Sequence, residues 1–452
     1  MRETDIRIKA GSVKVDFEKH NYRTPIKFGG NVLDKITLLN VSLVVENKAG
    51  KSVEGRGSMP LCSVWAWPSK VLTGADTEKA MMIHGERIAK IMNNYNEYGH
   101  PIDIAQDMEK TWEKAGVAVG KELGYAQEMP VMCSLVDSSP FEAALHDAYG
   151  KLHGKNVYDC YGSDYMNYDL SKYLDERFNS EYLDQYTLRQ PKERMPLYHL
   201  IGAVDHLTLD EVKKPVGDGL PEILSEWIVR DGLTHLKIKL NGDDLKWDVE
   251  RVVKVEKVAS VTQAKLGVKE WVYSLDFNEK CQNVEYLMDF LAQVKEKSPL
   301  AMGRVQYIEQ PTARDLKANP ENKMHKVAKI KPVVIDESLT DYETLLLSRE
   351  MGYSGVALKA CKGQSGALLM GAAAQKFKLF LCVQDLTCPG FSFLHSAGIA
   401  ARIPTIAAIE GNARQYLKPE AYRKWSELYP ETFTVKKGTI RTGILTKPGL
   451  GH

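Results

Sequence analysis

The sequence predicts a (β/α)8 barrel of the TIM type, an α/β fold, joined to an α+β capping domain. After about residue 195, eight short runs rich in β-branched residues alternate with amphipathic stretches. Such alternation is typical of a parallel sheet, and eight units are the number that closes a barrel. Before that point, strand-like and helix-like segments are segregated along the chain, as in an α+β domain.

The length of 452 residues supports a division into more than one domain. Ordinary domains have about 100–200 residues, and one barrel takes about 250. We predict a capping domain over residues 1–155, to which a C-terminal tail over 415–452 returns. An insertion or connector follows over 156–194, and the barrel, modified at its first units, occupies 195–414.

The capping domain begins with strands and continues with helices. Apolar and polar residues alternate from about Asp5 to Gly57, which predicts an antiparallel meander. Apolar residues recur at helical spacing from about Thr77 to Gly154. Within that stretch we expect Ser139 to cap the last helix, with Pro140 in its first turn.

The barrel strands are predicted from eight runs. They read PLYHLIGA, HLKIKL, VYSLDF, RVQYIEQP, PVVIDES, GVALKA, LFLCVQD and TIAAIEG. A doubly wound open sheet is the alternative, but the glycine-rich nucleotide fingerprint of that fold does not follow the early strands. The preceding segment, residues 158–194, is rich in Tyr, Asp and Asn with weak periodicity, and predicts a loop or a short helical excursion.

Composition narrows the classes of function. Sixty basic against fifty-nine acidic residues leave a formal charge of +1, without the basic excess of a nucleic-acid-binding protein. Seven cysteines occur without a CxxC pair, which disfavours a disulfide framework and a zinc ribbon. The polar N-terminus and the lack of any apolar run of membrane-spanning length predict a cytoplasmic protein without a membrane partner.

Charged residues end five successive predicted strands, where the active sites of barrels lie. In chain order these are Lys239 (with Lys237), Asp276, Glu309, Asp336 and Lys359, spaced by about one βα unit each. Three converging carboxylates would repel one another unless a cation lay among them, and hard oxygen ligands favour Mg2+, with Mn2+ as a substitute. Such an ion would bind a substrate carboxylate and offset the charge that develops when the α-proton leaves.

The lysines suit that proton transfer. A free lysine, with a pKa of about 10.4, is a poor base, but neighbouring cations lower its pKa. Lys237 and Lys239 are two residues apart, so they face the same side of their strand. Lys359 lies on the opposite side of the carboxylates in strand order. Two lysines facing opposite faces of one carbon form the two-base system of a racemase or epimerase.

These motifs resemble the enolase superfamily and, more narrowly, its muconate-lactonising branch, the group of mandelate racemase/muconate lactonizing enzyme-like proteins. The resemblance rests on Lys237-x-Lys239, SLDFN, YIEQP, IDES and ALKACKGQSGAL, and it covers nearly the whole chain. It implies that the metal ligands are Asp276, Glu309 and Asp336. It also implies that Lys239 and Lys359 are the acid/base pair, supported by Lys237.

The later strands depart from two other branches. Gln384-Asp385 ends the seventh strand without the histidine that mandelate racemase uses. Glu410-Gly411-Asn412 replaces the Asp-x-Asp with which dipeptide epimerases hold an ammonium group, which disfavours a dipeptide substrate. In this family, specificity comes from capping-domain loops, and residues 20–25 and 59–67 are the candidates. The substrate-binding residues that we predict are Asn278, Gln384, Asp385, Glu410, Arg23 and Tyr22.

The leading hypothesis is a racemase or epimerase acting on a small-molecule carboxylate. A dehydratase or cycloisomerase, of the muconate-lactonising or succinylbenzoate-synthase type, stays open; there one lysine abstracts the proton and the other stabilises charge. A third alternative is a metal-binding barrel that has lost catalysis. Barrels of this type often assemble, so we expect a homo-oligomer.

Overall fold

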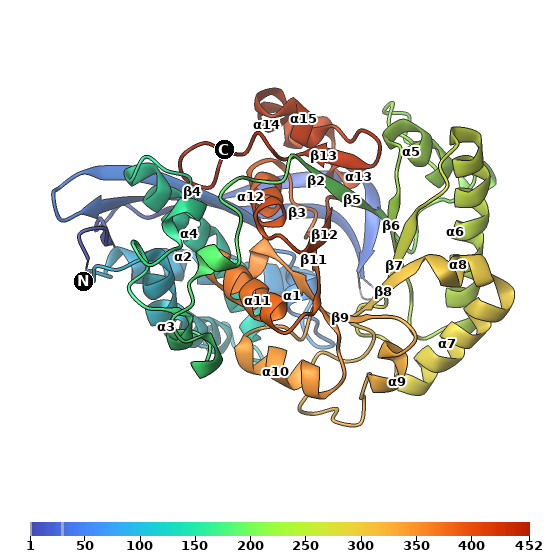
Figure 1. Ribbon diagram of the computed structural model, residues 1–452, viewed down its shortest axis with the longest axis horizontal. Helices are drawn as coiled ribbons and strands as arrows, with labels where there is room; N and C mark the ends of the chain where they lie inside the picture. Colours follow the sequence, from blue (N-terminus) through green and yellow to red (C-terminus); the bar gives the residue numbers. More distant parts are fainter. Residues whose placement is uncertain (1, 29–30) are drawn as a thin grey trace.

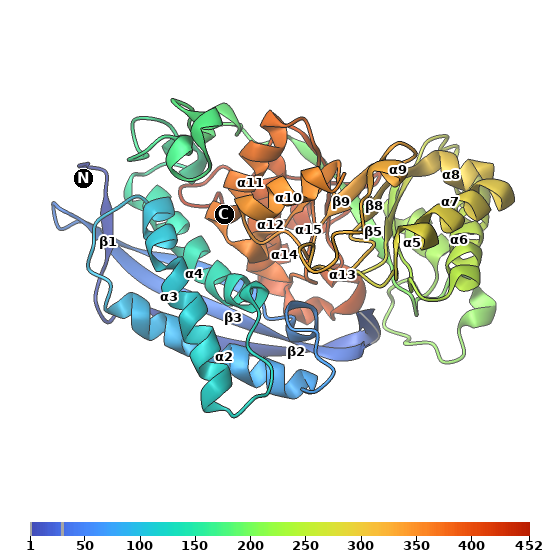
Figure 2. The ribbon, with the colours of Figure 1, turned by 90° about the horizontal axis from the view of Figure 1, so that it is seen from below.

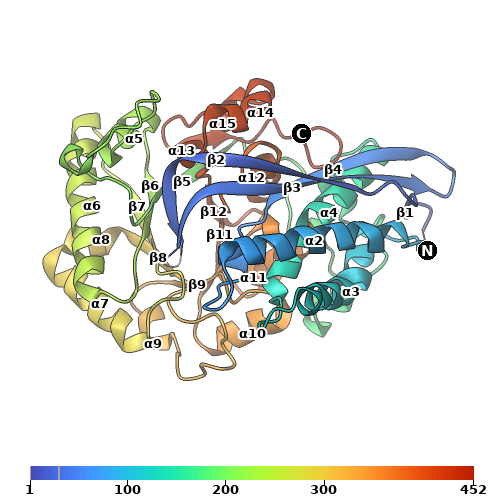
Figure 3. The same cartoon turned by 180° about the vertical axis from the view of Figure 1, so that it is seen from behind.

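The computed structural model describes residues 2–28 and 31–452 (Figure 1). The N-terminal part contains a four-stranded antiparallel sheet. Its strands are β1 (Ile6–Ile8), β2 (Lys14–Phe28), β3 (Asn31–Asn47) and β4 (Ser52–Pro60). The long strand β3 pairs with all three others. Figure 3 shows the hairpin of β2 and β3 crossing the molecule from the capping helices to the barrel.

Helices cover one face of this sheet (Figure 2). They are α1 (Ser63–Ala66), α2 (Gly74–Asn93), α3 (Pro101–Glu122) and α4 (Val131–Leu152). Strand β4 lies directly against α4 because Gly55 and Gly57 have no side chains. A Cβ atom at Gly55 would lie 2.0 Å from the Ala144 carbonyl oxygen, and one at Gly57 would lie 1.9 Å from that of Pro140.

The predicted start of α4 was wrong. The helix begins at Val131, and Pro140 lies in its interior. A proline within a helix leaves the carbonyl four residues earlier without its N–H partner. That carbonyl belongs to Val136, and the Ser139 hydroxyl donates to it at 2.8 Å. Ser139 therefore repairs the helix at the point where we expected it to start one.

An extended segment of short 3-10 turns connects α4 to the barrel. The turns are η1 (Val157–Cys160), η2 (Leu170–Lys172), η3 (Glu176–Phe178) and η4 (Leu183–Gln185). The segment is packed: the side chains of Tyr161, Met166, Leu170, Phe178 and Leu183 are all fully buried.

Eight parallel strands form a closed barrel, which confirms the predicted fold class. They are β5 (Arg194–Ile201), β6 (His235–Lys239), β7 (Val272–Asp276), β8 (Val305–Glu309), β9 (Val333–Ile335), β10 (Gly355–Leu358), β11 (Phe380–Val383) and β12 (Ile406–Glu410). Strand β12 pairs with β5, which excludes the open-sheet alternative. The first unit is enlarged, because residues 202–223, with η5 (Leu209–Glu211), precede its helix.

Helices alternate with the strands around the outside of the barrel (Figure 1). They are α5 (Leu224–Asp231), α6 (Leu245–Leu266), α7 (Val284–Lys297), α8 (Pro299–Arg304), α9 (His325–Ala328), α10 (Tyr342–Glu350), α11 (Gln364–Lys376) and α12 (Gly390–Arg402). None of the helices in the described ranges combines the length and hydrophobicity needed to cross a bilayer.

The inside of the barrel is filled by side chains from alternate strand positions. Tyr198 and Tyr307 pack there with small residues of other strands, including Ala357 and Ala408. The Tyr307 hydroxyl accepts a hydrogen bond from the Gln384 amide at 2.7 Å. This layer therefore supports a residue at the carboxyl end of the barrel.

The C-terminal tail contacts both parts of the molecule. It contains α13 (Ala413–Tyr416), η7 (Pro419–Ala421), α14 (Arg423–Leu428), α15 (Pro430–Phe433) and β13 (Thr439–Arg441). Strand β13 pairs antiparallel with the start of β5. The last residues reach the capping helix α4, where the amide of Leu450 donates to Asp147 Oδ1 at 3.2 Å.

Candidate active site

The charged strand ends gather at one end of the barrel, which we call the barrel mouth. The strand register places Lys239 beside Asp276, and Asp276 beside Glu309. Asp336 directly follows β9, and Lys359 directly follows β10. These five residues are all buried, with exposed fractions of 0–5%.

Lys237 lies at the centre of this group. Its Nζ is 2.7 Å from Glu309 Oε1, 3.0 Å from Asp276 Oδ2 and 3.0 Å from Glu410 Oε2. It also donates to Gln384 Oε1 at 2.8 Å. Burial acts to lower the pKa of Lys237, but the attraction of the carboxylates outweighs burial and raises that pKa well above its usual value. Lys237 is therefore held as a cation.

Lys239 lies nearer the opening of the mouth. Its Nζ donates to Asp276 Oδ2 at 2.5 Å and to Asn278 Oδ1 at 2.9 Å. Burial acts to raise the pKa of Asp276, but Lys239 and Lys237 together hold it below its usual range. The Asn278 backbone adopts the left-handed region at φ 44°, and its amide donates to Asp276 Oδ1 at 2.9 Å. Asn278 thus fixes both the lysine and the aspartate.

A second lysine pair faces the opposite aspartate. Lys359 Nζ lies 2.9 Å from Asp336 Oδ2. Lys362 Nζ lies 3.3 Å from Asp336 Oδ1 and donates to the Asp336 carbonyl at 2.6 Å. The sequence reasoning missed Lys362. The signal was present, because η6 (Ala360–Lys362) is a 3-10 turn, in which residues three apart lie on the same side.

Trp65, from α1, covers this second pair. Its ring centroid lies 4.3 Å from Lys359 Nζ, a cation–π contact. Its Nε1 donates to Glu337 Oε1 at 3.0 Å, and Asn278 Nδ2 donates to the same oxygen at 3.1 Å. The apolar segment over residues 59–67 therefore covers part of the mouth. Trp65 belongs to the segment 59–67 that the sequence offered as a specificity loop, whereas Glu337 was not predicted as a site residue.

The remaining predicted residues are placed differently. Asp385 accepts hydrogen bonds from the amides of Cys388 and Asn412, and burial, with Glu410, raises its pKa to about 7. Tyr22 is buried, and burial raises the pKa of its hydroxyl well above its usual value. Arg23 does not join the charged group; it pairs with Asp218 at 2.5 Å and donates to the Gln415 carbonyl.

The carboxylates can be tested as ligands of a divalent cation. Glu309 Oε2 is buried without a hydrogen-bond partner, and burial together with Asp276 raises the pKa of Glu309 well above its usual value. An unsatisfied buried carboxylate oxygen among other carboxylates is a suitable ligand for a divalent cation. Within residues 2–28 and 31–452, however, no three Asp, Glu, His or Cys side chains already converge as a metal site. Asp276, Glu309 and Asp336 supply suitable donors, which would have to turn away from the lysines to bind an ion.

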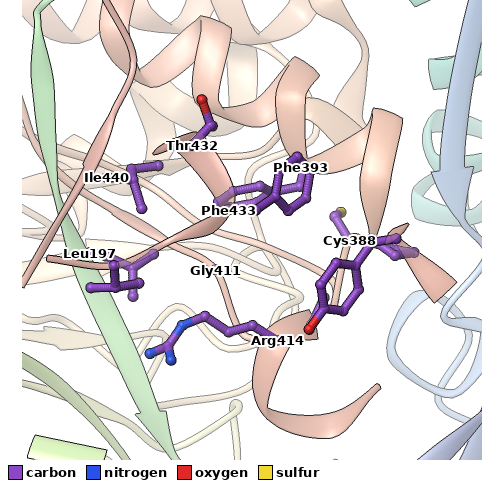
Figure 4. Close-up of a pocket in the computed structure, with 12 residues that line it drawn as sticks. Leu197, Cys388, Phe393, Gly411, Arg414, Thr432, Phe433 and Ile440 are labelled. Carbon is purple, nitrogen blue, oxygen red and sulfur yellow. The ribbon is translucent and has the colours of Figure 1, made fainter. Parts of the chain in front are cut away.

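An apolar void elsewhere is not part of this site. Figure 4 shows it between the barrel and the tail, bordered by Leu197, Phe393, Phe433 and Ile440. Its volume of about 20 Å3 is close to the space of one water molecule. It contains none of the predicted site residues and is a packing defect rather than a substrate cavity.

Solved structures with this fold include several enzymes. The N-succinyl Arg/Lys racemase from Bacillus cereus is 15% identical with a TM-score of 0.64, over 98% of this chain and 95% of that chain. The L-Ala-D/L-Glu epimerase from Bacillus subtilis is 16% identical with a TM-score of 0.62, over 98% of both chains. The muconate lactonizing enzyme from Pseudomonas fluorescens is 15% identical with a TM-score of 0.59, over 98% of this chain and 96% of that chain.

A family model gives the stronger assignment. No curated protein matches the sequence. The model described as Enolase C-terminal domain-like matches residues 220–452, more than half of the chain. This match and the mandelate racemase/muconate lactonizing enzyme fold of the neighbours confirm the resemblance seen in the sequence. The chain therefore belongs to the enolase C-terminal domain-like family.

Proposed function

We propose that this protein is a Mg2+-dependent racemase or epimerase that removes and returns the α-proton of a carboxylate substrate. The observation that carries the proposal is the pair of lysines on opposite sides of the mouth. Lys239 contacts Asp276, and Lys359 contacts Asp336, at 2.5 and 2.9 Å. A substrate α-carbon between them would present one face to each ammonium group.

Asp276, Glu309 and Asp336 would hold the metal. When bound, Mg2+, or Mn2+ in its place, supplies positive charge that offsets the charge developing on the substrate carboxylate. To act as a base, a lysine must first lose its proton, and at present Asp336 outweighs burial and raises the pKa of Lys359. Asp336 must therefore direct its charge elsewhere before Lys359 can accept a proton. Lys237, held by Glu309 and Glu410, stays protonated and supports the substrate charge.

The structural neighbours support this reaction class. Their names include epimerases and racemases, and two dipeptide epimerases were solved with Mg. The predicted substrate-binding residues Asn278, Gln384 and Glu410 contact Lys239 or Lys237 directly. Asp385 and Tyr22 belong to the same end of the barrel, whereas Arg23 would act only if its pairing with Asp218 were exchanged.

A dehydratase or cycloisomerase is the second candidate. The observation that favours it is asymmetry, because Trp65 covers Lys359 whereas Lys239 borders a cavity. In that reaction Lys239 would abstract the proton and Lys359 would only stabilise charge. The neighbours also include the muconate lactonizing enzyme and a 2-chloromuconate cycloisomerase.

The setting of the enzyme is also part of the proposal. The seven cysteines are free thiols in the structure, and six of them are buried. Free thiols are typical of a reducing compartment, so we place the protein in the cytoplasm. We expect a homo-oligomer, which light scattering of the purified protein would test.

The decisive experiment follows α-proton exchange by NMR in deuterium oxide with Mg2+. Each resolved enantiomer from a library of carboxylates is incubated with wild type, Lys239→Ala or Lys359→Ala, and its rate of α-proton exchange is measured. The exposed Lys246→Ala serves as a control. For a racemase, each active-site variant loses exchange from a different enantiomer by at least about 100-fold. Dependence on one lysine only, with loss of water or ring closure, would indicate the second candidate. No exchange on any substrate, with metal still bound, would indicate a barrel that has lost catalysis.

A further inference from the structure

A cavity of about 190 Å3 opens beside Lys239, between the loops that follow β6 and β7. Its polar lining consists of Lys27, Lys239, Asn241, Asp243, Asn278 and Lys280. Lys239 and Asn278 also belong to the charged group at the mouth. The cavity is therefore continuous with the proposed site of proton transfer.

The lining is basic. Three lysines face one carboxylate, that of Asp243. Among the residues that the structure describes, the Lys27 ammonium makes one long contact, 3.4 Å, with Asn241 Oδ1, and Lys280 is exposed. Two ammonium groups with little neutralisation, together with the side-chain amide of Asn241, favour a compact anion in this space.

The cavity is built on packed loops. Gly242 adopts φ 76°, and a Cβ atom there would lie 2.9 Å from the Cys281 amide nitrogen. Its amide and that of Asn241 both donate to the Asp248 carboxylate, at 2.9 and 2.7 Å. These hydrogen bonds fix the loop after β6, and Gly242 packs directly against the loop after β7, close to Lys280. A rigid lining binds a ligand at a lower entropic cost than a flexible one.

Lys27 comes from the capping domain. It lies near the end of β2, on the hairpin that reaches the barrel in Figure 3. Lys239 ends β6, and Lys280 lies in the loop that follows β7. Both domains therefore contribute charge to one cavity.

We propose that the substrate is a dicarboxylate, whose second carboxylate binds in this cavity between Lys27 and Lys280. This inference rests on the proposed function, which puts the first carboxylate and the α-carbon beside Lys239. A volume of about 190 Å3 accommodates a carboxylate on a short aliphatic arm, since one water molecule takes about 30 Å3.

The test is a calorimetric titration with two five-carbon acids, glutarate and pentanoate, in the presence of Mg2+. They differ only in the second carboxylate. The proteins are wild type, Lys27→Gln, Lys280→Gln and, as a control, Lys246→Gln on the exposed face of α6. We expect glutarate to bind at least about tenfold more tightly than pentanoate at low salt. Each cavity variant should weaken glutarate about fivefold and leave pentanoate unchanged, and high salt should reduce the preference.

The inference would be overturned if glutarate and pentanoate bound equally tightly. It would also be overturned if the two cavity variants kept the glutarate affinity of wild type. The titration needs no turnover, so it is independent of the exchange assay. A glutarate preference that depends on Lys27 and Lys280, without exchange on any acid, would keep the anion cavity and reject the proposed function. Exchange on monocarboxylates without any glutarate preference would reject the cavity and keep the function.

Discussion

The two sides of the barrel mouth carry the same charged groups, two lysines and one aspartate each, but the lysines lie on different secondary structures. On one side, Lys237 and Lys239 alternate along a strand and both contact Asp276. On the other, Lys359 and Lys362 lie one 3-10 turn apart and both contact Asp336. Two lysines per aspartate can thus be built either from a strand or from a turn.

The surroundings of the two sides differ more than their charges. The Lys239 side opens onto a cavity that includes Lys27. The Lys359 side is covered by Trp65 and connected to the capping helices through Glu142, which accepts a hydrogen bond from the Ser365 amide at 3.0 Å. We infer that the first side admits the substrate, whereas the second is held in place by the capping domain.

The largest expected effect is a loss of stability on removal of the Lys237 ammonium group, which contacts carboxylates from several strands of the mouth. Lys237→Met would leave Glu309, Asp276 and Glu410 buried without their common partner. Breaking a buried ion pair by removing one partner costs about 3–5 kcal/mol. We expect a much lower midpoint of urea unfolding, with Lys246→Met as the exposed control.

The comparison of the two sides sharpens that test. Lys362→Met should cost less, because Lys359 still neutralises Asp336 at 2.9 Å. Equal losses for Lys237→Met and Lys362→Met would show that the two sides are not energetically different.

The next effect concerns the connection between the second side and the capping domain. Burial raises the pKa of Glu142 to about 7, so the folded protein retains a proton that the unfolded chain loses near pH 4.5. Stability from this group is present at pH 4.5 and is lost as the pH rises to 7. The free energy of unfolding of Glu142→Gln, relative to that of wild type, should therefore be up to about 3 kcal/mol higher at pH 8 than at pH 4.5.

Thermal unfolding of both proteins between pH 4.5 and 8 measures this difference. The exposed Glu86→Gln is the matched control and should follow wild type at every pH. A stability difference between Glu142→Gln and wild type that does not change with pH would mean that folding does not raise the pKa of Glu142. A Cβ atom at Gly363 would lie only 2.3 Å from Glu142 Oε1. Gly363→Ala should therefore destabilise the same connection.

A smaller effect should separate the two lysines in catalysis. Trp65→Phe keeps an aromatic ring near Lys359 but removes the hydrogen bond of Nε1 to Glu337 Oε1 at 3.0 Å. A lost hydrogen bond to a charged group corresponds to about tenfold in rate. In the NMR exchange assay, we expect this loss for the enantiomer that Lys359 serves and little change for the other. Equal losses for both enantiomers would argue that Trp65 acts on the whole mouth.

The sequence predicted the barrel and the chain order of its charged ends because both depend on local patterns. Strands and helices alternate along the chain, and the carboxyl ends of five successive strands carry charged residues. The contacts across the closed barrel, such as Lys237 with Glu410, depend on packing of strands far apart in the chain. Lys362 was missed because a short 3-10 turn brings it to Asp336, and the contact of Trp65 with Lys359 could not be read from the predicted loop 59–67, because that loop reaches the mouth only in three dimensions.

The smallest expected effect lies at the edge of the open side, where Arg23 pairs with Asp218. The sequence suggested Arg23 as a substrate ligand, and the pair instead joins the β2–β3 hairpin to the enlarged first barrel unit. The Arg23 guanidinium lowers the pKa of Asp218, which is partly exposed, so the pair should contribute only about 1 kcal/mol. A double-mutant cycle of Arg23→Gln and Asp218→Asn, measured by urea unfolding, gives this coupling directly. If Arg23 only positions the hairpin, both single variants should change exchange rates equally and by less than about threefold. A larger loss of exchange in Arg23→Gln alone would instead return Arg23 to the substrate, because Asp218→Asn breaks the same pair and leaves the guanidinium in place.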